Sequence, residues 1–282
     1  MIITPDIDKL IDLAIMEDYS SGDATTQSLI PPDLPGEATL VSDENGILAG
    51  LEVSLQVFTK IDRNISITNT ITDGSQLIKG SKIATIHGPL GSILTAERTS
   101  LNFLRKLSGV ATETGKYVEK ISHTQARIVD TRKTTPGFRT LEKYAVRMGG
   151  GLNHRQNLSD GILIKDNHRQ TLSKQGLDLK DVILKAIGNA SHTIKVEIEV
   201  ETIADVKMAL EAGAGIIMLD NMDLSDMASA VALCKGKAIT EASGGINLSS
   251  VKDVAETGVD LISVGAITHS APNLDLSMDI KN

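Results

Sequence analysis

The segment from residue 194 to residue 220, IKVEIEVETIADVKMALEAGAGIIMLD, decides the fold class. An apolar run at 194–200 is followed by a helical pattern at 202–212 and by a second apolar run at 216–219. A strand, a helix and a strand in this order predict two parallel strands joined by a crossover helix. The same alternation recurs from residue 128 to residue 264, so this half of the chain is predicted to form one parallel α/β sheet.

The later strands each end in a polar or small residue. These residues are Lys165, Glu199, Asp220, Ser243 and Gly265. The carboxyl ends of parallel strands meet at one edge of a sheet, where α/β proteins place their active sites. The pattern fits a parallel α/β barrel and equally an open, doubly wound sheet.

The first half of the chain has a different pattern. Residues 6–17 have helical spacing, and residues 37–93 alternate in short runs separated by glycine turns, which predicts a small antiparallel sheet. A further helix is predicted over 92–108, ending at Gly109. We therefore expect an N-terminal α+β sandwich domain at 1–108, an α/β barrel domain at 109–269, and a tail at 270–282 that packs back on the first domain.

Composition excludes several classes of protein. The 282 residues are 41% hydrophobic with a formal charge of −8, as in a globular protein. One cysteine, Cys234, excludes a disulfide framework and a multi-thiolate metal site. Three Tyr, three Phe and no Trp argue against a base-stacking surface for nucleic acid. The apolar runs are too short to cross a membrane and no signal peptide is visible, so we expect a cytoplasmic protein without membrane or nucleic-acid partners.

Residues 98–169 form a basic segment, with 14 Lys and Arg against 6 Asp and Glu, inside an acidic protein. This contrast predicts a local site for an anion. Arg132 and Lys133 lie in a turn between a predicted strand and helix, and His154 and Arg155 follow three glycines. A structural explanation also exists for each group: Arg132 and Lys133 could belong to a loop that caps a helix, and the three glycines could simply end the preceding helix. Lys165, in contrast, lies at the end of an apolar strand and needs an anionic partner there.

Carboxylates and glycines complete the predicted site. Glu197 and Glu199 point the same way from their strand, and with Asp220 they could bind a ribose diol or Mg²⁺, or could neutralise the nearby cations. Backbone N–H groups at Ser243, Gly244 and Gly245 suit a phosphate, and so does the next strand end at Val264, Gly265 and Ala266. The predicted substrate is small and carries several anionic groups, which favours catalysis by electrostatic positioning.

The chain resembles the quinolinate phosphoribosyltransferase family along nearly its whole length. The motifs that carry this resemblance lie, in order, at 22–26, 97–104, 108–112, 130–137, 141–147, 149–155, 163–168, 219–221 and 243–245. The resemblance implies an N-terminal sandwich, an incomplete α/β barrel and a homodimer. It also implies an enzyme that converts quinolinate and phosphoribosyl pyrophosphate, with Mg²⁺, into nicotinate mononucleotide, pyrophosphate and CO₂.

The resemblance also implies roles for individual residues. Arg98 would reach the active site of the partner subunit, while Arg132, His154 and Arg155 would hold the quinolinate carboxylates. Lys133 and Lys165 would serve quinolinate and pyrophosphate, and Glu199 and Asp220 would meet ribose and Mg²⁺. The 5′-phosphate would bind at Ser243, Gly244 and Gly245 together with Val264, Gly265 and Ala266.

Three positions depart from the family pattern. Leu152 and Met148 stand where a polar residue and a cysteine are common, and Arg169 stands where an aliphatic residue is usual. The competing hypotheses are a molybdenum-transport-associated paralogue, a non-catalytic anion-binding protein, and an aldolase with Lys165 as Schiff-base former. Retention of Arg98, Arg132, Lys133, His154 and Arg155 favours the pyridine dicarboxylate substrate.

Overall fold

The computed structural model describes residues 2–281, which group into two compact units. Unit 1 comprises residues 1–115, 134–150 and 267–282, and unit 2 comprises residues 116–133 and 151–266. Met1 and Asn282, the outer limits of the predicted first domain and tail, lie outside the described residues. Within residues 2–281, no helix combines the length and the apolar character needed to cross a bilayer.

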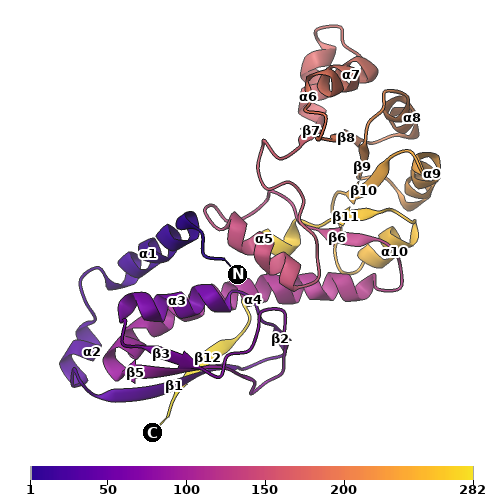
Figure 1. Cartoon of the computed structure of the whole chain (residues 1–282). Coiled ribbons are helices and arrows are strands. Elements are labelled where there is room, and N and C mark those ends of the chain that lie inside the picture. Colours follow the sequence, from indigo (N-terminus) through magenta and orange to yellow (C-terminus); the bar gives the residue numbers. More distant parts are fainter. Residues whose placement is uncertain (1, 282) are drawn as a thin grey trace. The chain divides into compact units, whose positions relative to one another are not determined.

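Unit 1 contains the predicted antiparallel sheet. Its strand order is β12-β1-β5-β3, with β12 at Leu276–Ile280, β1 at Pro35–Ser42, β5 at Lys82–Pro89 and β3 at Ser66–Thr68. All three pairings are antiparallel, and a two-stranded pair joins β2 (Gly46–Ile47) to β4 (Gln76–Leu77). The C-terminal segment thus supplies an edge strand to a sheet whose other strands come from the first ninety residues (Figure 1).

The helices of unit 1 depart from the sequence prediction in several places. They are α1 (Pro5–Tyr19), α2 (Ala24–Leu29), α3 (Leu51–Ile61), most of α4 (Leu90–Lys120), α5 (Arg139–Met148) and most of α11 (Ala266–His269). Helix α3 falls inside the stretch predicted to contain only strands. The Asp73 carboxylate accepts hydrogen bonds from the backbone N–H groups of Gly50 and Leu51, so a residue distant in sequence caps this helix.

The predicted end of the long helix at Gly109 is wrong. Helix α4 continues through this residue to Lys120. A Cβ atom at Gly109 would collide with the backbone carbonyl of Pro272. The glycine therefore permits close packing of two chain segments and does not end the helix.

Unit 2 contains the predicted parallel sheet, in the order β7-β8-β9-β10-β11-β6. The strands are β6 (Arg127–Val129), β7 (Ile162–Ile164), β8 (Val196–Val200), β9 (Ile216–Asp220), β10 (Ile239–Ser243) and β11 (Leu261–Ser263). The helices are α6 (Asp166–Ser173), which was not predicted, α7 (Leu179–Asn189), α8 (Ile203–Glu211), α9 (Leu224–Cys234) and α10 (Val251–Glu256).

This topology distinguishes the two architectures left open by the sequence. Strands β7 to β11 follow one another across the sheet without the reversal of order that defines a doubly wound fold. Figure 1 shows the helices of unit 2 along one side of a curved sheet. Because no strand ladder joins β6 to β7 in the described part of the chain, the barrel is incomplete. The predicted fold class is confirmed.

The two faces of the sheet differ in chemistry. On β8, Val196, Ile198 and Val200 are almost fully buried and belong to the apolar core, and β8 is in contact with α7 and α8. Glu197 and Glu199 alternate with these residues and so lie on the other face. The helices thus cover the apolar face of the sheet, and the carboxylates lie on the concave side of the incomplete barrel.

Candidate active site

The strand register gathers the predicted polar residues on this concave face. Glu199 pairs with Met218, and Ser243 pairs with Asp220, two residues further along β9. The side chains of Glu199, Asp220 and Ser243 therefore project from the same side of the sheet. Lys165 follows directly after β7, and its Nζ lies 3.3 Å from Glu199 Oε1. The side chains of Lys165 and Glu199 are 47% and 16% exposed, so this pair is accessible to a ligand.

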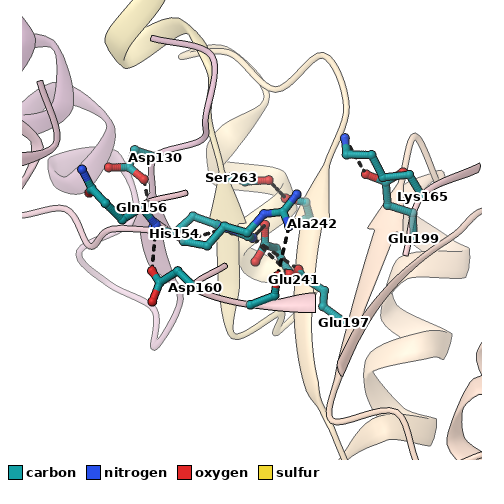
Figure 2. Close-up of polar contacts among 12 residues, drawn as sticks. Asp130, His154, Gln156, Asp160, Lys165, Glu197, Glu199, Glu241, Ala242 and Ser263 are labelled. Atoms are coloured by element: carbon teal, nitrogen blue, oxygen red, sulfur yellow. Dashed lines mark hydrogen bonds and ion pairs between the residues drawn. The ribbon is translucent and has the colours of Figure 1, made fainter. Parts of the chain in front are cut away.

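A second cluster lies beside this pair and consists of His154, Glu197 and Glu241 (Figure 2). His154 Nε2 is 3.1 Å from Glu197 Oε2 and 3.7 Å from Glu241 Oε1. Both carboxylates are nearly inaccessible, at 7% and 1% side-chain exposure. Burial first, and then the charge of Glu197, raise the pKa of Glu241 to about 8, while His154 and a hydrogen bond with Ser263 oppose this shift.

The loop that carries His154 is held by a buried aspartate. The Asp130 carboxylate accepts hydrogen bonds from the His154 backbone N–H at 2.8 Å and from Asn153 Nδ2 at 2.6 Å. His154 Nδ1 accepts the backbone N–H of Arg155 at 2.8 Å, so the ring proton resides on Nε2, which faces Glu197. Both ring nitrogens of His154 thus have protein partners in this structure.

Two arginines of the predicted quinolinate site lie near each other. Arg155 Nη1 donates to the Gly161 carbonyl at 3.1 Å. Burial, and next the positive charge of Arg132, lower the pKa of Arg155, whereas Glu197 and Glu199 act in the opposite direction. Two cations that destabilise each other in a partly buried site favour an anionic ligand between them. The exposed side chain of Lys133 follows directly in the chain.

The loop after β10 has the backbone geometry expected of an anion cradle. Gly244 has φ +97°, and a Cβ atom there would collide with the Asn221 side chain. Asn221 in turn donates its backbone N–H to the Ser243 carbonyl at 3.0 Å. Gly245 has φ +59° and open space around the position of a Cβ atom. Two successive glycines in this conformation let backbone N–H groups approach a phosphate closely.

The neighbouring strand end supplies the rest of the predicted phosphate site. Val264, Gly265 and Ala266 follow β11, which pairs in parallel with β10. Val264 is buried and donates its backbone N–H to the Val129 carbonyl at 3.0 Å. The two predicted halves of the cradle therefore follow adjacent strands of one sheet.

Two sets of residues offer ligands to a metal ion. Among residues 2–281, the metal-binding atoms of His154, Glu197 and Glu241 lie within 4.8 Å of one another. Glu199 and Asp220, the predicted Mg²⁺ ligands, provide partly accessible carboxylates on neighbouring strands of the same face. Mg²⁺ prefers oxygen ligands and retains several waters, which fits the accessible pair better than a dry cluster built around an imidazole.

The sequence analysis missed Glu241 as a site residue, and it assigned Arg98 to the active site of the partner subunit. Glu241 lies two residues before Ser243 on β10, and side chains two residues apart on a strand lie on the same face. This spacing was the signal in the sequence that could have identified Glu241. Arg98 is exposed on α4 in unit 1, so it is not among the residues that unit 2 gathers. The other predicted site residues all belong to unit 2.

Comparison with family models matches nearly the whole chain. A model described as "Quinolinate phosphoribosyl transferase, C-terminal domain" matches residues 110–279. A second, described as "Quinolinate phosphoribosyl transferase, N-terminal domain", matches residues 23–108.

Individual proteins show the same similarity. The probable nicotinate-nucleotide pyrophosphorylase [carboxylating] of Bacillus subtilis (strain 168) is 42% identical over 272 residues, which are 96% of this chain and 92% of that protein. The crystal structure of NadC from Streptococcus pyogenes has a TM-score of 0.95 at 40% identity, covering 100% of this chain and 99% of that one. The nicotinate-nucleotide pyrophosphorylase of Francisella tularensis has a TM-score of 0.92 at 39% identity, covering 99% and 98%.

Proposed function

This chain belongs to the quinolinate phosphoribosyltransferase family, and on that premise we propose how its residues carry out the reaction of the family. It is a carboxylating nicotinate-nucleotide pyrophosphorylase, a pentosyltransferase of NAD biosynthesis. It converts quinolinate and phosphoribosyl pyrophosphate into nicotinate mononucleotide, pyrophosphate and CO₂. The observation that best supports this function in the structure is the position of two arginines, a Lys–Glu pair and a glycine cradle around one concave sheet face.

Quinolinate carries two adjacent carboxylates, and we assign these to Arg132 and Arg155. Planar guanidinium groups bind carboxylates through paired hydrogen bonds, and a dianion would relieve the repulsion between the two cations. His154 would join them by exchanging its Nε2 contact with Glu197 for a substrate carboxylate. Lys133 would add a further positive charge at the accessible side of the loop.

The phosphoribosyl group would occupy the strand ends. We assign its 5′-phosphate to the backbone of Ser243, Gly244 and Gly245, completed by Val264, Gly265 and Ala266. Glu199 and Asp220 would accept hydrogen bonds from the ribose hydroxyl groups, and Lys165 would bind the pyrophosphate. When bound at Glu199 and Asp220, Mg²⁺ would neutralise charge on the pyrophosphate.

These assignments account for the chemistry without a general base. The pyridine nitrogen forms a bond to the anomeric carbon as the bond to pyrophosphate breaks, with Lys165 compensating the negative charge of the leaving group. The ring then carries a positive charge, which stabilises the electron pair left at carbon 2 when its carboxylate departs as CO₂. A proton from water completes the new C–H bond. The residues of the site hold both substrates in the orientation for attack.

Three further features of the proposal rest on the family resemblance and on the sequence. The enzyme would be a homodimer in which Arg98 reaches the active site of the partner subunit. It would use Mg²⁺, and it would work in the cytoplasm. The exposed position of Arg98 on α4 supports the first of these features.

One incubation tests the proposed function. Purified protein is mixed with quinolinate, phosphoribosyl pyrophosphate and Mg²⁺, and CO₂ and nicotinate mononucleotide are followed by mass spectrometry. Nicotinate serves as a parallel substrate. Product and CO₂ from quinolinate, with no product from nicotinate, are expected. A folded protein that forms no product would refute the proposal and would favour the competing hypothesis of a molybdenum-transport-associated paralogue.

A further inference from the structure

Arg169, one of the three departures from the family pattern, makes two hydrogen bonds at the edge of the active site. It lies on α6, four residues after Lys165. Its Nη1 donates to the Glu199 backbone carbonyl at 3.1 Å, and its Nη2 donates to Asp205 Oδ2 at 3.0 Å. The side chains of Arg169 and Asp205 are 26% and 16% exposed, so the two groups meet in a partly buried position.

Both bonds connect segments that carry substrate-facing side chains. Lys165 is the N-cap residue of α6, and its backbone N–H donates to His168 Nδ1 at 3.0 Å. Glu199 is the penultimate residue of β8, and Asp205 lies in the first turn of α8, where the Thr202 hydroxyl accepts its backbone N–H. Arg169 therefore joins the segment that follows Lys165 to the segment that carries Glu199.

The topology explains why such a link is needed. Strand β7 has three residues and, in the described part of the chain, pairs only with β8, because it forms the open edge of the incomplete barrel. Strand pairing therefore supports the end of β7 on one side only, the side of β8. The Lys165–Glu199 ion pair spans the same two strand ends, but it is accessible and would open when a substrate binds. The bonds of Arg169 do not involve the substrate-facing atoms and can persist during catalysis.

We propose that Arg169 is a positioning residue of the transferase, which acts through Glu199 and Lys165 by holding the ends of β7 and β8 at the spacing that the phosphoribosyl group requires. This inference rests on the proposed function, in which Glu199 and Lys165 meet phosphoribosyl pyrophosphate. Quinolinate, assigned to Arg132 and Arg155, should be affected much less.

The test uses Arg169→Met, which retains the aliphatic stem and removes both hydrogen bonds. Arg169 and Asp205 line an open hollow of about 570 Å³, so water can replace the guanidinium without collapse of the fold. We expect the KM for phosphoribosyl pyrophosphate to rise about tenfold, which corresponds to about 1.4 kcal/mol. The KM for quinolinate should stay within about twofold of the wild-type value, as expected when one substrate's ligands are displaced.

Two further variants follow the individual bonds. Arg169→Lys can retain one bond and should recover part of the loss, and Asp205→Asn removes the charged partner but keeps the bond to Glu199. Each should raise the KM for phosphoribosyl pyrophosphate about threefold, because charge-assisted hydrogen bonds weaken when one partner changes. These variants also test the proposal if Arg169→Met fails to fold.

Arg105 provides a matched control in unit 1. It also donates to one carbonyl and one carboxylate, Leu274 O at 3.3 Å and Asp275 Oδ1 at 2.9 Å. Arg105→Met should leave both KM values unchanged. Equal changes in the two KM values, or no change in folded Arg169 variants of an active enzyme, would overturn the inference. An inactive wild-type enzyme would instead overturn the proposed function and the inference with it.

Discussion

Substitution of Glu241 by glutamine should change how the stability of the protein depends on pH. Glu241 is 1% exposed and lies among Glu197, His154 and Ser263, and its pKa is raised from 4.5 to about 8. In the folded protein this carboxyl group therefore keeps its proton up to about pH 8. In the unfolded chain it ionises near its ordinary value. Between these two pH values the unfolded state binds fewer protons, so the free energy of unfolding falls as pH rises.

The magnitude follows from the two pKa values. A pKa raised from 4.5 to about 8 corresponds to roughly 5 kcal/mol, at about 1.4 kcal/mol per pKa unit. This stabilisation is fully present below pH 4.5, falls as pH rises, and is lost once pH has passed through 8. Between pH 5 and pH 8 the loss amounts to roughly 3–4 kcal/mol. Glutamine has nearly the same shape, can donate a hydrogen bond to Glu197 and cannot ionise, so Glu241→Gln should remove this loss.

The assay is urea unfolding followed by far-UV circular dichroism at pH 5, 6, 7 and 8. The wild-type protein should lose roughly 3–4 kcal/mol relative to Glu241→Gln over this interval, because every other titrating group is common to both proteins. Glu211→Gln, which removes a carboxylate from the exposed end of α8, serves as the matched control and should follow the wild-type curve. Parallel curves for wild type and Glu241→Gln would refute the reasoning, since they would mean that Glu241 is ionised in the folded protein.

Three other predictions address the substrate sites. Gly244→Ala should raise the KM for phosphoribosyl pyrophosphate and destabilise the protein by about 1–3 kcal/mol, because its φ of +97° and its contact with Asn221 exclude a Cβ atom. Gly236→Ala, at φ +74° with nothing within 4 Å, should show a smaller loss of stability and unchanged kinetics. Arg155→Lys should raise the KM for quinolinate about tenfold in steady-state assays, since lysine cannot make the paired hydrogen bonds; an unchanged KM would remove Arg155 from the site. Arg98→Ala and Lys165→Ala should each abolish turnover, and mixing the two should restore part of it through hybrid dimers; no recovery after verified subunit exchange would contradict a shared site.

Local patterns in the sequence predicted most of the secondary structure in unit 2. The alternation of Val196, Glu197, Ile198 and Glu199 predicts a strand with both carboxylates on one face, because successive side chains of a strand point to opposite sides. The family motifs predicted the fold class and the reaction, both of which the comparisons support. The pattern could not show which face is covered, because that depends on where α7 and α8 pack.

Helix α3 and Gly109 show the same limit in unit 1. The cap of α3 comes from Asp73, which lies 22 residues after Leu51, and a search of neighbouring residues cannot find it. Gly109 resembles a helix stop in the sequence, but its neighbour in space is Pro272. In both places, contacts between distant segments override the local signal.

For this protein, the sequence by itself determined the alternation of strands and helices, the family, and the identity of the charged residues that can meet an anionic substrate. These properties depend on neighbours along the chain or on ordered motifs, which a sequence displays directly. Only the tertiary structure brought His154 from a loop, Glu197 from β8 and Glu241 from β10 within 4.8 Å. It also joined Arg169 to the carbonyl of Glu199. These contacts depend on the order of strands in the sheet and on burial. Burial first, and then the neighbouring Glu197 carboxylate, raise the pKa of Glu241.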